Sequence, residues 1–158
     1  MISNSQPRII PLNLLLFVFS ISAAYPSGIE IKNVTFCGSH DKTAKVKFSP
    51  WPFIPSGTIF NVSLTFTPAV DVVYATSEYE AVSVFDGKVV FRGRKDDLCD
   101  NASDLCSIPA GETYVWTSSL TLLTAPPFLK MQTFRVTARL FNGEYVMFFC
   151  MESVFKIY

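Results

Sequence analysis

Residues 133–140 read Thr-Phe-Arg-Val-Thr-Ala-Arg-Leu, and polar and apolar side chains alternate along them without a break. Successive side chains of a β-strand point to opposite faces, so this alternation predicts a strand with one buried and one wet face. Asn142-Gly143 follows shortly after, and this dipeptide is the strongest short signal for a hairpin turn. We therefore predict that the strand pairs with a last strand from about Tyr145 to Ile157.

The same period of two recurs through the rest of the chain. Polar and apolar residues alternate at 44–48, 60–67 and 113–122, and turn-forming pairs such as Asp86-Gly87 separate these stretches. About seven or eight short strands at this spacing, with no sustained helical period, predict an all-β, immunoglobulin-like two-sheet β-sandwich. The Cys-Trp-Cys arrangement of antibody domains is absent, so we expect a sandwich of another family.

Length and composition narrow the class of protein. The 158 residues suffice for one domain, and 13 Lys and Arg balance 13 Asp and Glu, so we expect no nucleic-acid partner. The 15 Phe exceed what a small close-packed core needs. We therefore expect some of them to line an apolar cavity between the two sheets.

The first segment of the chain, residues 1–24, is predicted to be a secretory signal peptide, which leaves one domain of residues 25–158. Arg8 precedes an apolar run that ends in Ser22-Ala23-Ala24, with small residues where cleavage needs them. A membrane anchor would need a longer run, without the interruption at Pro11. Three sequons agree with secretion and are candidate glycosylation sites: Asn33, Asn61 and Asn101.

The chain contains four cysteines, Cys37, Cys99, Cys106 and Cys150. In a secreted protein an even set of this kind predicts a disulfide framework. Three pairings are possible. Closure of the short loop favours Cys99 with Cys106, which leaves Cys37 with Cys150. A zinc site is the alternative, but the sequence has no Cys-x-x-Cys knuckle.

Five segments together resemble the ML family of lipid-recognition domains. They are Phe36-Cys37-Gly38-Ser39, residues 46–52 (Val-Lys-Phe-Ser-Pro-Trp-Pro), Ser56-Gly57 with the strand that follows, Cys99 to Cys106 with Ile108-Pro109-Ala110-Gly111, and Phe149-Cys150. The family includes the Niemann-Pick type C lysosomal sterol carrier, the ganglioside activator, the lipopolysaccharide co-receptor subunit and the group 2 mite allergens. No single segment is specific, but their order and spacing agree over essentially the whole predicted domain.

The resemblance implies two sheets that splay apart to hold a lipid, with Cys37–Cys150 and Cys99–Cys106 as the family's outer and middle disulfides. One position departs from the family pattern. Trp51 stands where the sterol carriers have a cysteine, so the third family disulfide is missing. We expect packing of Trp51 and Phe53 to hold the loop of residues 50–57 in its place.

The residues expected to contact the lipid form two sets. The first set occupies inward positions of the predicted strands: Phe60, Leu64, Phe66, Trp116, Leu122, Phe134, Val136 and Phe148. Along residues 145–151 the side chains on both faces of the predicted last strand are apolar, so we expect both faces to be shielded from water. The resemblance places Phe91, eight residues before Cys99, at the cavity mouth and Phe128 on its rim. The alternative is that the inward residues form ordinary core and that these two aromatic residues cap its ends.

Residues 92–97 carry several charges close to the predicted mouth. Residues 92–97, Arg-Gly-Arg-Lys-Asp-Asp, put three cations beside the predicted mouth, where they could meet a phosphate or an anionic bilayer. A solvated mixed-charge loop is the competing interpretation.

The sequence offers little for catalysis. A Cys-His nucleophile built from Cys37 and the only histidine, His40, would need a free thiol. No phosphate-binding Gly-rich loop or nucleophile elbow occurs, so we expect no enzyme, no metal and no cofactor.

These observations predict a secreted lipid-binding and transfer protein that holds a sterol, phospholipid or glycolipid between two sheets. Its partners would be the lipid and, transiently, a membrane. The alternative is a lipid-presenting co-receptor subunit that binds a receptor ectodomain. The expected location is extracellular, or the lumen of a lysosome or vacuole reached through the secretory pathway.

Overall fold

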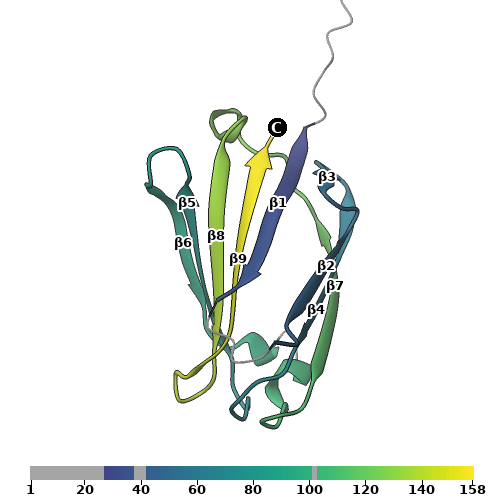
Figure 1. The fold of residues 1–158 in the computed structure, drawn as a ribbon, viewed down its shortest axis with the longest axis vertical. Coiled ribbons are helices and arrows are strands. Elements are labelled where there is room, and N and C mark those ends of the chain that lie inside the picture. The colour runs from purple at the N-terminus through teal and green to yellow at the C-terminus, as the bar shows by residue number, and fades with distance from the viewer. Residues whose placement is uncertain (1–26, 38–41, 101–102) are drawn as a thin grey trace, which may run out of the picture.

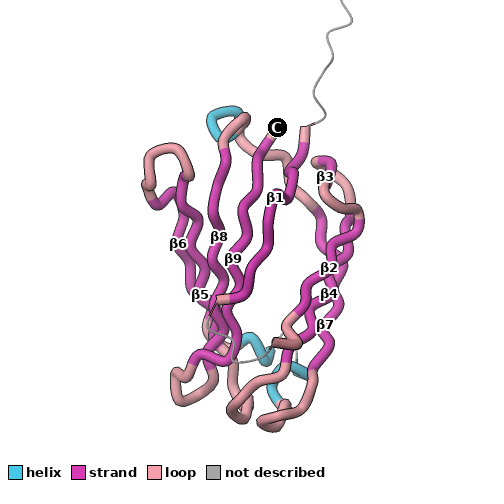
Figure 2. Tube along the Cα trace, in the orientation of Figure 1, coloured by secondary structure: helices cyan, strands magenta, loops and turns pink. Residues whose placement is uncertain are grey.

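The computed structural model describes residues 27–37, 42–100 and 103–158. Within these residues nine strands form two antiparallel sheets that face each other, as Figure 1 and Figure 2 show. The predicted all-β, two-sheet sandwich is confirmed. The predicted signal peptide, residues 1–24, lies outside the described residues, as do His40 and Asn101.

The larger sheet has six strands in the order β3-β1-β9-β8-β5-β6, and the smaller has three in the order β2-β4-β7. The strands are β1 (Gly28–Phe36), β2 (Lys45–Ser49), β3 (Phe53–Pro55), β4 (Ile59–Phe66), β5 (Thr76–Ser83), β6 (Val89–Lys95), β7 (Tyr114–Thr121), β8 (Thr133–Phe141) and β9 (Met147–Ile157). Three short 3-10 helices connect them: η1 (Leu98–Asp100), η2 (Ser103–Cys106) and η3 (Pro127–Leu129). The sequence predicted one or two strands fewer, because a strand as short as β3 leaves no visible period. None of the helical segments in the described residues has the length and apolarity to cross a bilayer.

The predicted hairpin between the last two strands is confirmed, since β8 and β9 pair antiparallel with Leu140 opposite Phe149. Its turn is longer than a two-residue turn. The side-chain oxygen of buried Asn142 accepts hydrogen bonds from the backbone N–H groups of Glu144 (3.1 Å) and Val146 (2.8 Å). Because residues 142–146 form the turn, β9 begins at Met147 and not at the predicted Tyr145.

Buried side chains form two clusters between the sheets. The first consists of Phe66, Val72, Ala75, Leu105, Ile108, Phe148 and Phe149, and the second of Ile31, Ile54, Phe60 and Val62. Phe66 is central to the first, because its ring centroid lies 5.7 Å from that of Tyr114, 5.8 Å from that of Phe148 and 5.2 Å from that of Phe149. Aromatic pairs at these separations add stability beyond the area that they bury.

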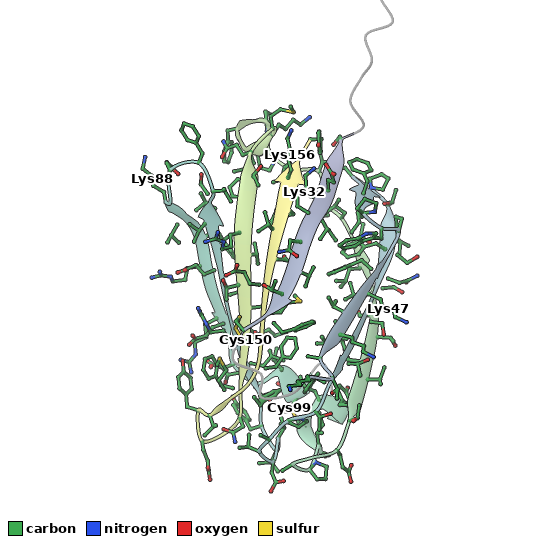
Figure 3. The ribbon with its side chains drawn as sticks, viewed as in Figure 1. Lys32, Lys47, Lys88, Cys99, Cys150 and Lys156 are labelled. Atoms are coloured by element: carbon green, nitrogen blue, oxygen red, sulfur yellow. A yellow bond between two sulfur atoms is a disulfide. The ribbon has the colours of Figure 1, made fainter. Side chains whose placement is uncertain are left out.

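Both predicted disulfides are present. Cys37 is bonded to Cys150, with Cα atoms 4.9 Å apart, and Cys99 to Cys106, with Cα atoms 5.6 Å apart. The first bond ties the end of β1 to β9, and the second closes the segment that contains η1 and η2. Figure 3 labels Cys150 and Cys99 in these two regions. No cysteine is free, so no thiolate is left for the zinc site considered above.

Two kinds of contact hold residues 50–57, the loop in which the third family disulfide is missing. The ring of Trp51 stacks on that of Phe48 at a centroid distance of 6.1 Å, and Phe53 meets Tyr158 edge-on at 6.0 Å. In addition, residues 53–55 form β3, which pairs with β1. Backbone pairing therefore supplements the aromatic packing that the sequence predicted, while the Trp51 side chain stays half exposed.

Candidate functional site

A cavity of about 760 Å³ lies between the two sheets. Side chains from β4, β6, β7, β8 and β9 and from the two short helices η1 and η2 line it. The lining residues are Leu64, Phe66, Lys95, Leu98, Leu105, Val115, Trp116, Thr117, Ser118, Leu120, Ala138, Leu140, Phe149 and Met151. Most of these side chains are apolar, so the cavity suits an apolar molecule.

The alternation along β8 and β9 explains the wall that the larger sheet contributes. Ala138 pairs with Met151 and Leu140 pairs with Phe149, so these four side chains share the inner face. The intervening Arg139 stands opposite Cys150 on the outer face. Because Ala138 is small, it leaves space at the middle of β8 that a larger side chain would fill.

The cavity is open to solvent along the edge of the smaller sheet. β6 and β7 are the last strands of their sheets, and no strand pairing joins them. Val115 and Leu120 of β7 line the cavity and are nevertheless exposed. A ligand could therefore enter between these two strand edges without breaking a backbone ladder.

The three cations that the sequence placed near the mouth point in different directions. Arg92 forms an ion pair with Glu80, and the Nε of Arg94 donates to Asp96 at 2.8 Å, which raises the pKa of Arg94. Both arginines lie on the outer face of the larger sheet. Lys95 lies on the inner face and lines the cavity. The solvated mixed-charge interpretation therefore fits the two arginines and does not fit Lys95.

The residues predicted to contact lipid divide into lining and core residues. Leu64, Phe66 and Trp116 line the cavity. The others of the inward set pack elsewhere: Phe60 is buried in the second cluster, Leu122 packs against that cluster, Phe134 packs on Phe155, Val136 is half-buried on the inner face of β8, and Phe148 is buried against Phe66. For Phe60, Leu122, Phe134 and Phe148 the core interpretation describes the packing in the structure.

Most of the larger sheet's contribution to the cavity lining was not predicted from the sequence. Phe149 and Met151 line the cavity, whereas Phe148 was the residue of this strand predicted to do so. The reason is an irregularity in register between Leu140 and Phe141, which changes the face of β9 that points inward. The apolar character of both faces of residues 145–151 was the available signal. Leu98 and Leu105, next to the cysteines of the short disulfide, had no periodic signal at all.

The two predicted mouth residues are exposed, Phe91 to 55% and Phe128 to 72%, and neither lines the cavity. Phe91 lies on the inner face of β6, where its ring stacks on that of Tyr79 at 5.5 Å. Gly93 makes room for this arrangement, since a Cβ there would lie 2.4 Å from the Tyr79 ring. Phe128 lies in η3. Their exposure argues against a role as caps of the core, and a role at the mouth stays a prediction.

Neither of the two sequon asparagines on described residues, Asn33 and Asn61, belongs to the cavity lining. Asn33 is exposed on β1, and Asn61 is exposed on β4, where its side-chain oxygen accepts a hydrogen bond from Ser119 at 2.7 Å. Asn61 borders a shallow groove on the outer face of the smaller sheet, with Lys47 and Thr117. No group of three metal-ligating side chains occurs among the described residues.

A sandwich of two sheets around an apolar cavity, open along one pair of strand edges, defines a class of protein that can hold an apolar ligand between its sheets. The sequence of residues 32–157 matches the family described as ML domain. Because the match spans most of the chain, this protein belongs to the ML-domain family. No curated protein has a sequence similar enough to this chain to be detected as a relative.

Two solved structures share this fold. Chicken MD-1, complexed with lipid IVa, aligns with a TM-score of 0.59 and 13% identity over 84% of this chain and 99% of that chain. A Niemann-Pick type C2 protein from the Japanese carpenter ant aligns with a TM-score of 0.56 and 18% identity over 78% of this chain and 97% of that chain. At these identities the similarity establishes the fold.

Proposed function

We propose that this protein is a secreted lipid carrier that holds a sterol, phospholipid or glycolipid between its sheets and transfers it between membranes. The observation that supports the proposal is the cavity of about 760 Å³ with a mostly apolar lining and an open edge. Membership of the ML-domain family and the lipid IVa bound to chicken MD-1 point in the same direction. We expect no catalytic activity, because nothing in the described cavity lining pairs a nucleophile with a base.

Exposed apolar side chains support transient contact with a membrane. Phe85 in the β5–β6 turn is 98% exposed, and Leu123 and Phe128 are also strongly exposed. The β5–β6 turn and η3 lie at the same end of the sandwich (Figure 1). Soluble proteins seldom expose several large apolar side chains at one end without an interaction that uses them.

The two disulfides and the absence of a free cysteine support a destination in the secretory pathway, either outside the cell or in the lumen of a lysosome or vacuole. The predicted signal peptide and the sequons at Asn33, Asn61 and Asn101 belong to the same proposal. Treatment of the secreted protein with an N-glycosidase, followed by mass measurement, would show which sequons carry glycans.

A lipid-presenting co-receptor subunit is the second candidate. The edge strand β6 exposes Val89 and Val90, and an unpaired strand edge can accept a partner chain. Lipid transfer between vesicles by the purified protein alone would support the carrier. A stable complex with a leucine-rich-repeat ectodomain, together with no transfer, would support the subunit.

We expect Ala138→Trp to weaken lipid binding by about tenfold or more, because a filled cavity loses the ligand's contacts. Ala138 lines the cavity at the middle of β8, and the indole would occupy the space that the ligand's apolar body needs. The matched control is Thr137→Trp, since Thr137 is the next residue of the same strand and points to the outer face. Titration with a fluorescent sterol and a fluorescent phospholipid measures both variants.

Equal loss of binding in Thr137→Trp and Ala138→Trp would count against the cavity as the binding site. Native mass spectrometry of the protein from its secretory host, followed by organic extraction, would identify a co-purifying lipid. A mass without ligand from several secretory hosts, with no binding of either fluorescent lipid, would refute the carrier proposal.

Phe91→Asp and Phe128→Asp test the predicted mouth. A charge where the lipid must pass is expected to weaken binding by about 1 to 3 kcal/mol, because the carboxylate loses hydration when lipid covers it. Thermal stability should change little, since both side chains are exposed. Val73→Asp is the control, because Val73 is 75% exposed, belongs to the connection between β4 and β5 and does not line the cavity. A strongly lowered melting temperature with unchanged binding would identify Phe91 or Phe128 as part of the core.

A further inference from the structure

We propose that the ligand of this cavity is an amphiphile with an anionic headgroup, a carboxylate or a phosphate, and that Lys95 binds this headgroup. The inference rests on the proposed lipid-binding function and narrows its ligand class. It also separates this protein from a carrier of neutral sterols.

The strand pairing determines the direction in which Lys95 points. Ser77 of β5 pairs with Leu140 of β8 on one side and with Lys95 of β6 on the other. Residues directly opposite each other in neighbouring strands share a face, and Leu140 lines the cavity. Lys95 therefore lies on the inner face of the larger sheet, and it lines the cavity next to the apolar walls.

The neighbouring cations are already neutralised on the other face. Arg92 is paired with Glu80, and Arg94 is paired with Asp96 at 2.8 Å and lies 3.6 Å from Glu78. The cavity lining within the described residues contains no Asp or Glu, so Lys95 is its only charged member there. No carboxylate in the described part of the chain lies within ion-pair distance of the Lys95 ammonium. The charge of Lys95 is thus available to a ligand.

The position of Lys95 matches the geometry that an amphiphile needs. Its side chain is exposed at the open edge, while Leu98, Leu140 and Phe149 lie deeper among the lining residues. An apolar chain can occupy the cavity while its headgroup stays at the edge, in contact with both water and the ammonium. Charge-assisted hydrogen bonds are about twice as strong as neutral ones. A neutral headgroup would leave the ammonium at the edge without a counterion.

The test uses three ligands that share one apolar chain: decanoate, decyl phosphate and decanol. Calorimetric titration of the delipidated full-length secreted protein at neutral pH is expected to show about fivefold to tenfold tighter binding of the two anions than of decanol. Lys95→Met should remove this preference and leave decanol binding unchanged or tighter. Lys95→Arg should retain it. Raising the salt concentration should weaken decanoate binding to the wild type and have little effect on the methionine variant.

Lys47→Met is the matched control, since it removes the same charge from the outer face of the smaller sheet (Figure 3). It should leave all three affinities unchanged. Equal wild-type affinities for decanol and decanoate would overturn this inference and leave the carrier proposal standing. If none of the three ligands binds, this inference fails, and the titrations with fluorescent sterol and phospholipid decide the carrier proposal separately. Competition by inorganic phosphate alone at the concentrations of decyl phosphate would also overturn it, because the site would then recognise the ion without the chain.

Discussion

Replacement of both Cys37 and Cys150 by alanine is expected to lower the free energy of unfolding by about 4 to 5 kcal/mol on the loop-entropy account of disulfides. The two cysteines are 113 residues apart in the sequence, so their bond constrains nearly the whole domain in the unfolded state. Cys150 is also buried, and the backbone N–H of Cys37 donates to the carbonyl of Cys150 at 2.9 Å. Equilibrium denaturation in guanidinium chloride, with the wild type measured in parallel, gives the difference.

The short disulfide provides the comparison. Alanine at both Cys99 and Cys106, which are only 7 residues apart, should cost about 2 kcal/mol on the same account. Its loss should affect ligand binding more than its modest stability cost suggests, because Leu98 and Leu105 flank the two cysteines and line the cavity. A larger stability loss from the short bridge than from the long one would contradict the loop-entropy account for this protein.

Phe66→Ala is the second change with a large expected effect, a destabilisation of about 3 to 5 kcal/mol. Phe66 is only 1% exposed and contacts three other aromatic rings from β7 and β9. Its removal would therefore detach the smaller sheet from the larger one at the first cluster. Phe66 also lines the cavity, so the variant should be weakened in both stability and ligand binding.

Phe91→Ala is the control for the stability loss expected of Phe66→Ala. Phe91 is an aromatic residue on the inner face of the larger sheet, but it is 55% exposed, so its truncation should change stability by less than about 1 kcal/mol. Thermal and chemical denaturation of the two variants measures the contrast. A stability loss in Phe91→Ala as large as that in Phe66→Ala would show that the Phe91 side chain is buried in solution, and would contradict this prediction.

Local sequence patterns were sufficient to predict most of the fold. The alternation of residues 133–140 and the Asn142-Gly143 turn predicted the β8–β9 hairpin, and the structure shows it. Both signals act over a few residues, because side-chain direction and turn conformation depend on the adjacent backbone. The extra residues of the turn were not predicted, since they depend on hydrogen bonds from the backbone to the Asn142 side chain.

The candidate site was predicted only in part. Leu64, Phe66 and Trp116 were assigned to the cavity and line it, while Phe60, Phe134 and Phe148 were assigned to it and are buried in the core. An inward position on a strand looks the same in the sequence whether it meets another side chain or a cavity. The difference arises from how far apart the two sheets lie at that point, which no local pattern encodes.

The all-β class, the hairpin between the last two strands and the presence of a disulfide framework followed from the sequence alone, because period, turn chemistry and the number of cysteines are local or countable properties. Which aromatic residues surround the cavity and which fill the core depends on the three-dimensional arrangement of the two sheets. The tertiary structure also separated Arg92 and Arg94 from Lys95, three cations that are close together in the sequence. The physical reason is the pairing of β6 with β5, which turns the two arginines toward carboxylates on the outer face and the lysine toward the cavity.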